Sequence, residues 1–129
     1  MFLRIDPDNG LAIYDQVVRQ VKFAIAGEAL KPGDLVPSVR ELARDLAINP
    51  NTVSRAYLQL QHDGVLESVR GVGLSVATGA AKRCRTEGAN LIRERLAQVF
   101  DEARLSHLDP NELRKMVSTE LESALKRKD

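Results

Sequence analysis

Residues 38–57 read SVRELARDLAINPNTVSRAY and contain the start signals of two short helices. Ser38 and Glu41 have the spacing of a capping box, in which each side chain accepts a hydrogen bond from the other residue's backbone amide. Asn49 is a good N-cap, and Pro50 suits the first helical position because no amide donor is needed there. Apolar residues at helical spacing follow both signals. Two helices joined by about three residues predict a helix-turn-helix.

The flanking residues complete a small domain around this motif. Apolar residues recur at helical spacing over about residues 11–29 and predict a preceding helix. After the motif the period changes from 3.6 to 2, so residues 65–69 and 74–76 predict two strands, with residues 70–73 as the turn between them. A hairpin directly after a helix-turn-helix is a wing. We therefore expect a fold that is mainly α with a small β wing, a winged helix-turn-helix domain over residues 1–77.

The remaining residues, 78–129, predict two amphipathic helices after a joint of small residues at 78–81. One helix runs from about residue 82 or 86 to residue 104, and the other is capped by Asp109. Two helices alone bury too little apolar surface to be stable independently, so self-association is the favoured interpretation. We expect a homodimer held by an apolar stripe that comprises Ile92, Leu96, Val99, Phe100, Leu113, Val117, Leu121 and Leu125.

Composition excludes several classes of protein. The 129 residues carry a formal net charge of only +1, and residues 1–77 contain eight basic and nine acidic side chains, so bulk charge does not indicate a nucleic-acid partner. Apolar runs are at most four residues long, far short of the ~20 that a membrane span needs. Asp6 and Asp8 stand where a signal peptide would need apolar residues. We expect no membrane partner and a cytoplasmic location.

Catalytic and metal-binding signals are weak. No glycine-rich phosphate loop follows a strand, and no nucleophile has a histidine base nearby, so we expect neither an enzyme nor a cofactor. His62 and His107 are interpreted as surface or satisfied histidines, and no metal site is expected. A single cysteine, Cys84, cannot form an internal disulfide. Its neighbours Arg83 and Arg85 would lower a thiol pKa, but an incidental linker cysteine is favoured over a redox switch.

The start of the second motif helix is the sharper functional signal. It offers amide, hydroxyl and guanidinium groups that suit base edges and phosphates in a major groove, from Asn49, Asn51, Thr52, Ser54 and Arg55. Helix capping is the competing interpretation, and it explains Asn49 but not the set. Arg40 follows the cap of the preceding helix, and Arg70 lies at the wing tip. For both arginines a phosphate contact competes with a surface salt bridge that would be worth little.

Several segments in order resemble the GntR family of bacterial transcription regulators: AIYDQV at 12–17, LKPGD at 30–34, VPSVRELA at 36–43, NPNTVSRAY at 49–57, DGV at 63–65 and RGVG at 70–73. The resemblance covers about residues 11–77 and implies a winged helix that binds a double-stranded DNA operator as a dimer. The family's DNA-contacting positions fall on Arg40, Asn49, Asn51, Thr52, Ser54, Arg70 and Gly71. Arg55 and Tyr57 also match the family pattern, Tyr57 mainly as a packing residue.

The sequence departs from the family pattern in three places. Ala12 stands where proline is usual, Leu74-Ser75 replaces Thr-Phe after the wing, and Pro50 occupies a position where some relatives carry a base-reading arginine. These departures leave the operator sequence open. The short tail resembles that of the YtrA-type subfamily, whose two C-terminal helices dimerise and whose members often control neighbouring transporter genes.

Three functional points stay open at the level of sequence. A repressor is favoured over an activator, but the residues do not set the sign of regulation. One two-helix tail leaves no obvious room for an enclosed effector pocket of ~300 Å³ or more, so a small-molecule effector is left undecided, with a dimer or interdomain cleft as its place. The competing class is a winged helix that docks on another protein and has no DNA target, which the charge of −1 on residues 1–77 favours.

Overall fold

The computed structural model describes residues 3–127 and, within them, contains five helices and one antiparallel pair of strands. The elements are α1 (Ile13–Ala26), α2 (Val39–Leu46), α3 (Pro50–His62), β1 (Leu66–Val69), β2 (Gly73–Val76), α4 (Ala80–Leu105) and α5 (Pro110–Lys126). The fold class is the expected one, mainly α with a small β wing. Among the described residues, no helix combines the length with the apolar character that a membrane span requires.

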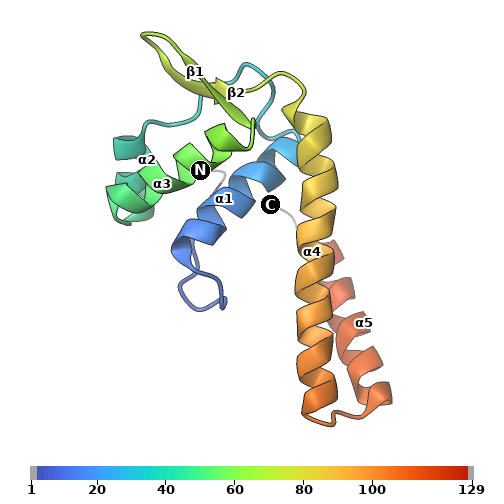
Figure 1. The fold of residues 1–129 in the computed structure, drawn as a ribbon. Coiled ribbons are helices and arrows are strands. Elements are labelled where there is room, and N and C mark those ends of the chain that lie inside the picture. Colours follow the sequence, from blue (N-terminus) through green and yellow to red (C-terminus); the bar gives the residue numbers. More distant parts are fainter. Residues whose placement is uncertain (1–2, 128–129) are drawn as a thin grey trace. The chain divides into compact units, whose positions relative to one another are not determined.

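The structure divides into two compact units, one ending at Asn90 and the other beginning at Leu91. In the first unit α3 packs on both α1 and α2, and β1 and β2 form a hairpin beside these helices (Figure 1). Its core is continuous and contains fully buried side chains from all three helices, including Val21, Leu42, Val53 and Leu60. The helical periodicity of the sequence is thus satisfied by packing within this unit.

Side chains fix the helix-turn-helix as expected. The Glu41 amide donates to Ser38 Oγ and the Ser38 amide donates to Glu41 Oε1, both at 3.1 Å, which completes the capping box. These hydrogen bonds to Ser38 lower the pKa of Glu41. Ala47 ends α2 in a left-handed conformation (φ 55°), and Asn49 caps α3 two residues later. A turn this short holds the two helices at a defined angle.

The wing is a hairpin of two four-residue strands, with Leu66 opposite Val76 and Val69 opposite Gly73. Gly71 and Gly73 adopt positive φ of 76° and 144° in and after its turn, where a side chain would be strained. Leu35 forms an isolated antiparallel β-bridge with Ser75 and so adds a short third segment to the hairpin. The amide of Val36 donates to Leu74 O at 2.9 Å, so this segment ties the wing to the residues that precede α2.

Helix α1 is shorter than the 11–29 expected from periodicity. At its N-terminal side the buried amide of Gln16 donates to the backbone oxygens of Asp6 and Leu11 and accepts from the Asp6 amide, which holds the preceding loop against the helix. At the other end Glu28 takes a positive φ of 65° and breaks the helical path. Apolar spacing alone could not reveal either event.

Helix α4 begins at Ala80, inside the stretch interpreted as a joint, and so Cys84 is not a linker residue. Ala80, Cys84 and Gly88 are buried on one face of α4, and they belong to the first unit. The compact units therefore divide at residue 90, thirteen residues beyond the boundary drawn at residue 77, because these small side chains let the helix pack closely. Whether the two parts divide into DNA-binding and dimerisation functions remains a prediction.

The second unit contains the rest of α4 and all of α5. Asp109 caps α5 as expected by accepting from the amides of Asn111 and Glu112, both at 3.1 Å. His107 lies between the helices with a positive φ of 55°. None of the described α5 residues is buried. The predicted dimerisation residues keep much of their surface exposed, from 39% for Phe100 and Val117 to 72% for Leu125, while Leu113 is half-buried.

Candidate nucleic-acid interface

The first two turns of α3 bring together polar side chains on the outside of the first unit. Asn51 and Arg55 are exposed, and Thr52 and Ser54 are half-buried. Between them Val53 is fully buried. The burial of the apolar side chains fixes the rotation of the helix and therefore leaves the amide, hydroxyl and guanidinium groups at the surface.

Asn49 is the N-cap of this helix, and its Oδ1 accepts from the Asn51 amide at 2.8 Å. Pro50 occupies the first helical position, where it has no amide to leave unsatisfied. The capping interpretation of Asn49 is therefore correct. The capping hydrogen bond uses the carboxamide oxygen of Asn49 and leaves its NH₂ group available as a donor.

Two further basic residues lie at the surface of neighbouring elements. Arg40 is the second residue of α2, and Arg70 follows β1 at the tip of the wing with Gly71 next to it. Both arginines are exposed, and neither guanidinium forms an ion pair or a hydrogen bond within the described range 3–127. The surface salt bridges that competed with a phosphate contact for these residues are thus not formed.

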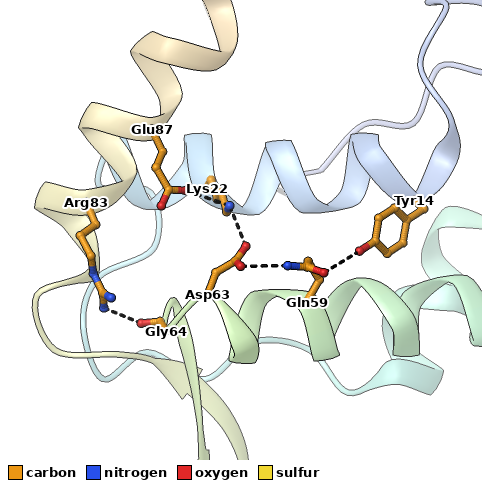
Figure 2. A network of polar contacts seen from close by, with 7 residues as sticks. All are labelled: Tyr14, Lys22, Gln59, Asp63, Gly64, Arg83 and Glu87. Carbon is orange, nitrogen blue, oxygen red and sulfur yellow. Dashed lines mark hydrogen bonds and ion pairs between the residues drawn. The ribbon is translucent and has the colours of Figure 1, made fainter.

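Arg55 has a partner that sequence patterns did not reveal. Its guanidinium carbon lies 4.9 Å from the centroid of the Tyr14 ring, a cation–π geometry. The Tyr14 hydroxyl donates to Gln59 Oε1 at 3.3 Å, one turn further along α3 (Figure 2). Tyr14 lies forty-one residues before Arg55, so the pair depends on α1 packing against α3 and not on local sequence.

Tyr57 serves packing, as the sequence suggested. Its side chain is 3% exposed, and its hydroxyl donates to the backbone oxygen of Pro37 at 2.7 Å. Burial raises the pKa of this phenol, so it stays protonated. The hydrogen bond ties α3 to the residue before the cap of α2 and helps to fix the helix-turn-helix angle.

A groove of about 640 Å³ lies between the start of α2 and the wing. Its lining includes Pro37, Val72 and Leu74 together with the carboxylates of Glu41 and Asp45. Two carboxylates at its wall disfavour an anion such as a phosphate. The groove is therefore separate in chemistry from the polar start of α3.

Cys84 differs from expectation in its acidity as well as its place. Burial raises the pKa of its thiol, and the nearby Glu87 carboxylate raises it further, while Lys22 and Arg83 oppose this change. The basic neighbours in sequence therefore do not produce an activated thiolate, because desolvation is the larger effect. His62 lies at the end of α3 and is exposed, in keeping with a surface histidine.

Comparison with known proteins identifies the fold. Residues 13–76 match the family model described as bacterial regulatory proteins, gntR family. The HTH-type transcriptional repressor YtrA of Bacillus subtilis (strain 168) is 37% identical over 116 residues, which are 89% of this chain and 88% of that protein. The chain belongs to the GntR family. Because the similarity to YtrA includes the tail, it is a member of the short YtrA-type subfamily.

Solved GntR structures agree with this assignment. YtrA from Sulfolobus acidocaldarius, a GntR-family transcription factor, aligns with a TM-score of 0.58 at 31% identity and covers 78% of this chain and 99% of its own. AraR(DBD) in complex with operator ORX1 aligns with a TM-score of 0.51 at 26% identity over 60% of this chain and 99% of its own. The relatives are named as regulators and not as enzymes, and the chain is accordingly a GntR transcriptional regulator of the DNA-binding class.

Proposed function

We propose that this GntR regulator binds a palindromic operator as a homodimer and represses transcription. One observation carries the proposal: the short polar side chains of Asn51, Thr52 and Ser54 lie with Arg55 at the surface of the first turns of α3, where the apolar side chains are buried. Such groups match the donor and acceptor pattern of base edges in a major groove. The AraR complex supports the proposal, since a GntR relative of the same fold binds an operator.

In this proposal α3 enters the major groove and the helix before it crosses the phosphate backbone. Arg40, at the start of α2, and Arg70, at the wing tip, supply unpaired guanidinium groups for phosphates or a minor groove. Gly71 lets the backbone of the wing tip approach closely because it has no side chain. Asn49 contributes its NH₂ group while its oxygen caps the helix.

The dimer is proposed to form through the apolar stripe of the second unit. Ile92, Leu96 and Val99 on α4 are between 47% and 49% exposed, and Val117 and Leu121 on α5 are 39% and 53% exposed. A unit of two helices cannot cover such a stripe by itself, and a second copy of the chain offers a complementary surface by symmetry. Two-fold symmetry places the half-sites about one helical turn, ~34 Å, apart.

Repression is the proposed outcome because a dimer on a promoter would block polymerase, and the B. subtilis relative is named as a repressor. A cytoplasmic location follows from access to the chromosome. The acid-lined groove beside the wing would disfavour an anionic ligand.

Gel shifts on an operator obtained by in vitro selection with the wild-type protein test the proposed face. Ser54→Ala is expected to cost about 1–3 kcal/mol and to relax sequence preference, as for a lost base contact. Arg40→Ala and Arg70→Ala are expected to weaken binding to all sequences alike and to reduce the salt slope by about 1 for each lost phosphate contact.

Arg114→Ala is the matched control, since it removes the same charge from an exposed position in the second unit. Its affinity and salt slope should equal those of the wild type. Unchanged binding and salt slope in all three test variants would contradict the assigned face. A wild-type protein that binds no duplex in a salt-dependent way would favour the competing role in protein docking.

A further inference from the structure

The first turns of α4 are tied to the first unit by a lysine that is shared between two carboxylates (Figure 2). Lys22 Nζ on α1 lies 2.9 Å from Asp63 Oδ2, at the end of α3, and 2.8 Å from Glu87 Oε2 on α4. The Lys22 side chain is 10% exposed. A single ammonium therefore joins three helices, and we call Glu87, Lys22 and Asp63 the three-helix bridge.

The bridge reaches α3 through a carboxylate that is itself held. Asp63 Oδ1 accepts from Gln59 Nε2 at 2.8 Å while Oδ2 receives the ammonium, so both oxygens are engaged. Burial alone would lower the pKa of Lys22, but its hydrogen bonds to Glu87 and Asp63 raise it above the ordinary value. The lysine is therefore charged at physiological pH, and its ammonium faces both carboxylates.

Two other features hold the same part of α4. Arg83 donates through Nη2 to the backbone oxygen of Gly64 at 2.6 Å, just beyond α3. The buried face of Ala80, Cys84 and Gly88 has little side-chain volume, and a Cβ at Gly88 would lie 3.5 Å from the Phe23 ring. Close packing and directional polar contacts together fix the first turns of α4 on the end of α3 and on α1.

This fixation matters because the chain crosses from the first unit to the second once, between Asn90 and Leu91, within α4. If a dimer is held by residues beyond 91, the covalent connection between that contact and each α3 helix passes through the first turns of α4. Linked binding modules accept a range of spacings that widens as the link becomes more flexible. The ties at residues 80–88 therefore govern how sharply one spacing is preferred.

We propose that Glu87 and Lys22 are positioning residues that select the separation of operator half-sites. They touch no DNA in this proposal and act through the attachment of α4 to α1 and α3. The inference rests on the proposed homodimeric operator binding. It assigns the discrimination between correctly and incorrectly spaced half-sites to the three-helix bridge, and the recognition of each half-site to the start of α3.

Glu87→Gln is the most selective test, because it weakens the tie to α4 and leaves the pair of Lys22 and Asp63 in place. The probes are duplexes with two copies of the half-site selected by the wild type, separated by spacers that lengthen or shorten by single base pairs, and a duplex with one half-site. Glu94→Gln is the control, since it removes the same charge from an exposed position further along α4.

The readout is the dissociation constant for a duplex whose spacer is one base pair too long or too short, divided by the dissociation constant for the optimal duplex. We expect Glu87→Gln to reduce this ratio by about threefold or more. Affinity for the single half-site should stay within about twofold of the wild type. A merely structural role would lower affinity for all duplexes together and leave the ratio unchanged. Lys22→Met should give a larger reduction of the ratio, and Glu94→Gln none.

A wild-type spacing profile in folded Glu87→Gln, checked by thermal unfolding, would overturn the inference. Should Lys22→Met fail to fold, the Glu87→Gln and Arg83→Gln variants still decide, since each removes one tie to α4. The proposed function fails separately, if the wild type itself binds no duplex or shows equal affinity for one and two half-sites.

Discussion

The two units of this GntR regulator are built from helices with similar apolar periodicity, yet the apolar faces are buried in the first unit and exposed in the second. In the first unit Val21 and Leu42 are fully buried, whereas in the second unit Val117 and Leu96 are 39% and 47% exposed. Periodicity shows which face of a helix is apolar, and the number of neighbouring elements decides whether that face is covered. The contrast separates a unit whose apolar faces are covered by its own elements from one whose apolar stripe stays exposed.

Leu60→Ala should show the largest effect on the first unit. Leu60 is fully buried, and its truncation leaves a cavity, so we expect a loss of about 2–5 kcal/mol in the free energy of unfolding. Leu58 is 62% exposed on the same helix, and Leu58→Ala should change stability by less than about 0.5 kcal/mol. Chemical denaturation measures both, and equal losses would show that burial in this core does not determine stability.

Leu121→Asp is expected to affect association and not the core of the first unit. A carboxylate buried at a dimer contact without a partner costs several kcal/mol, so the dimer should weaken by about 100-fold or more. Sedimentation equilibrium measures the change, and Thr119→Asp places the same charge on an exposed α5 position as a control. A folded dimer in Leu121→Asp would show that the stripe has another role.

Asp63→Asn should flatten the acid dependence of stability. Burial alone would raise the pKa of Asp63, but hydrogen bonds from Lys22 and Gln59 lower it below the ordinary value of 3.8. A carboxyl with a depressed folded-state pKa contributes stability above 3.8, and this is lost as pH falls through the lower folded-state pKa. The free energy of unfolding of the wild type should exceed that of the variant by roughly 1 kcal/mol at neutral pH. This difference should shrink below pH 3.8.

The same pH titration would also show a result that contradicts the Asp63→Asn prediction. Denaturation curves collected from neutral pH downward give the free energy of unfolding of each protein. A difference that stays constant as pH falls below 3.8 would show that the Asp63 charge does not stabilise the fold. Lys22 adds no slope in this window, because its raised pKa places its loss of stabilisation above pH 10.5.

Gly88→Ala should give the smallest change in stability, and it should stabilise the protein, unlike the other substitutions. Gly88 is helical, and an added Cβ would meet Cδ1 and Cε1 of Phe23 at 3.5 and 3.6 Å, ordinary contact distances. We expect a gain of up to about 1 kcal/mol from helix propensity, measured by thermal unfolding. Gly64→Ala is the contrasting variant, since φ is +74° there and the substitution should cost about 1 kcal/mol.

Local chemistry allowed most elements to be predicted. The Ser38–Glu41 box, the Asn49 and Asp109 caps, and the change of period before the wing depend on residues a few positions apart. The GntR resemblance then identified the family. Helix α4 was placed too late, because the small residues Ala80 and Cys84 contribute little to an apolar pattern, although they are fully buried.

The contacts that the sequence did not predict join residues that lie far apart in the chain. Lys22 reaches Asp63 and Glu87, and Tyr14 reaches Arg55, each through the packing of separate helices. A lysine or glutamine on a helix normally indicates a solvated face, so the burial of Gln16 and Lys22 contradicts the ordinary expectation. Tertiary packing, which supplies the acceptors and donors, had to be seen before these residues could be assigned.

The cap of α3 biases the hydrogen bonding of Asn49 toward donation. An asparagine normally addresses an adenine edge with both its oxygen and its NH₂ group, but here the oxygen is engaged by the Asn51 amide. One lone pair of this oxygen is committed to the cap, so an Asn49 that faces the groove would act mainly through its NH₂ group as a donor, which matches guanine N7 and O6, adenine N7, thymine O4 or a phosphate oxygen. The N4 amino group of cytosine offers no acceptor, and selected operators should be depleted of cytosine at the base that Asn49 reaches.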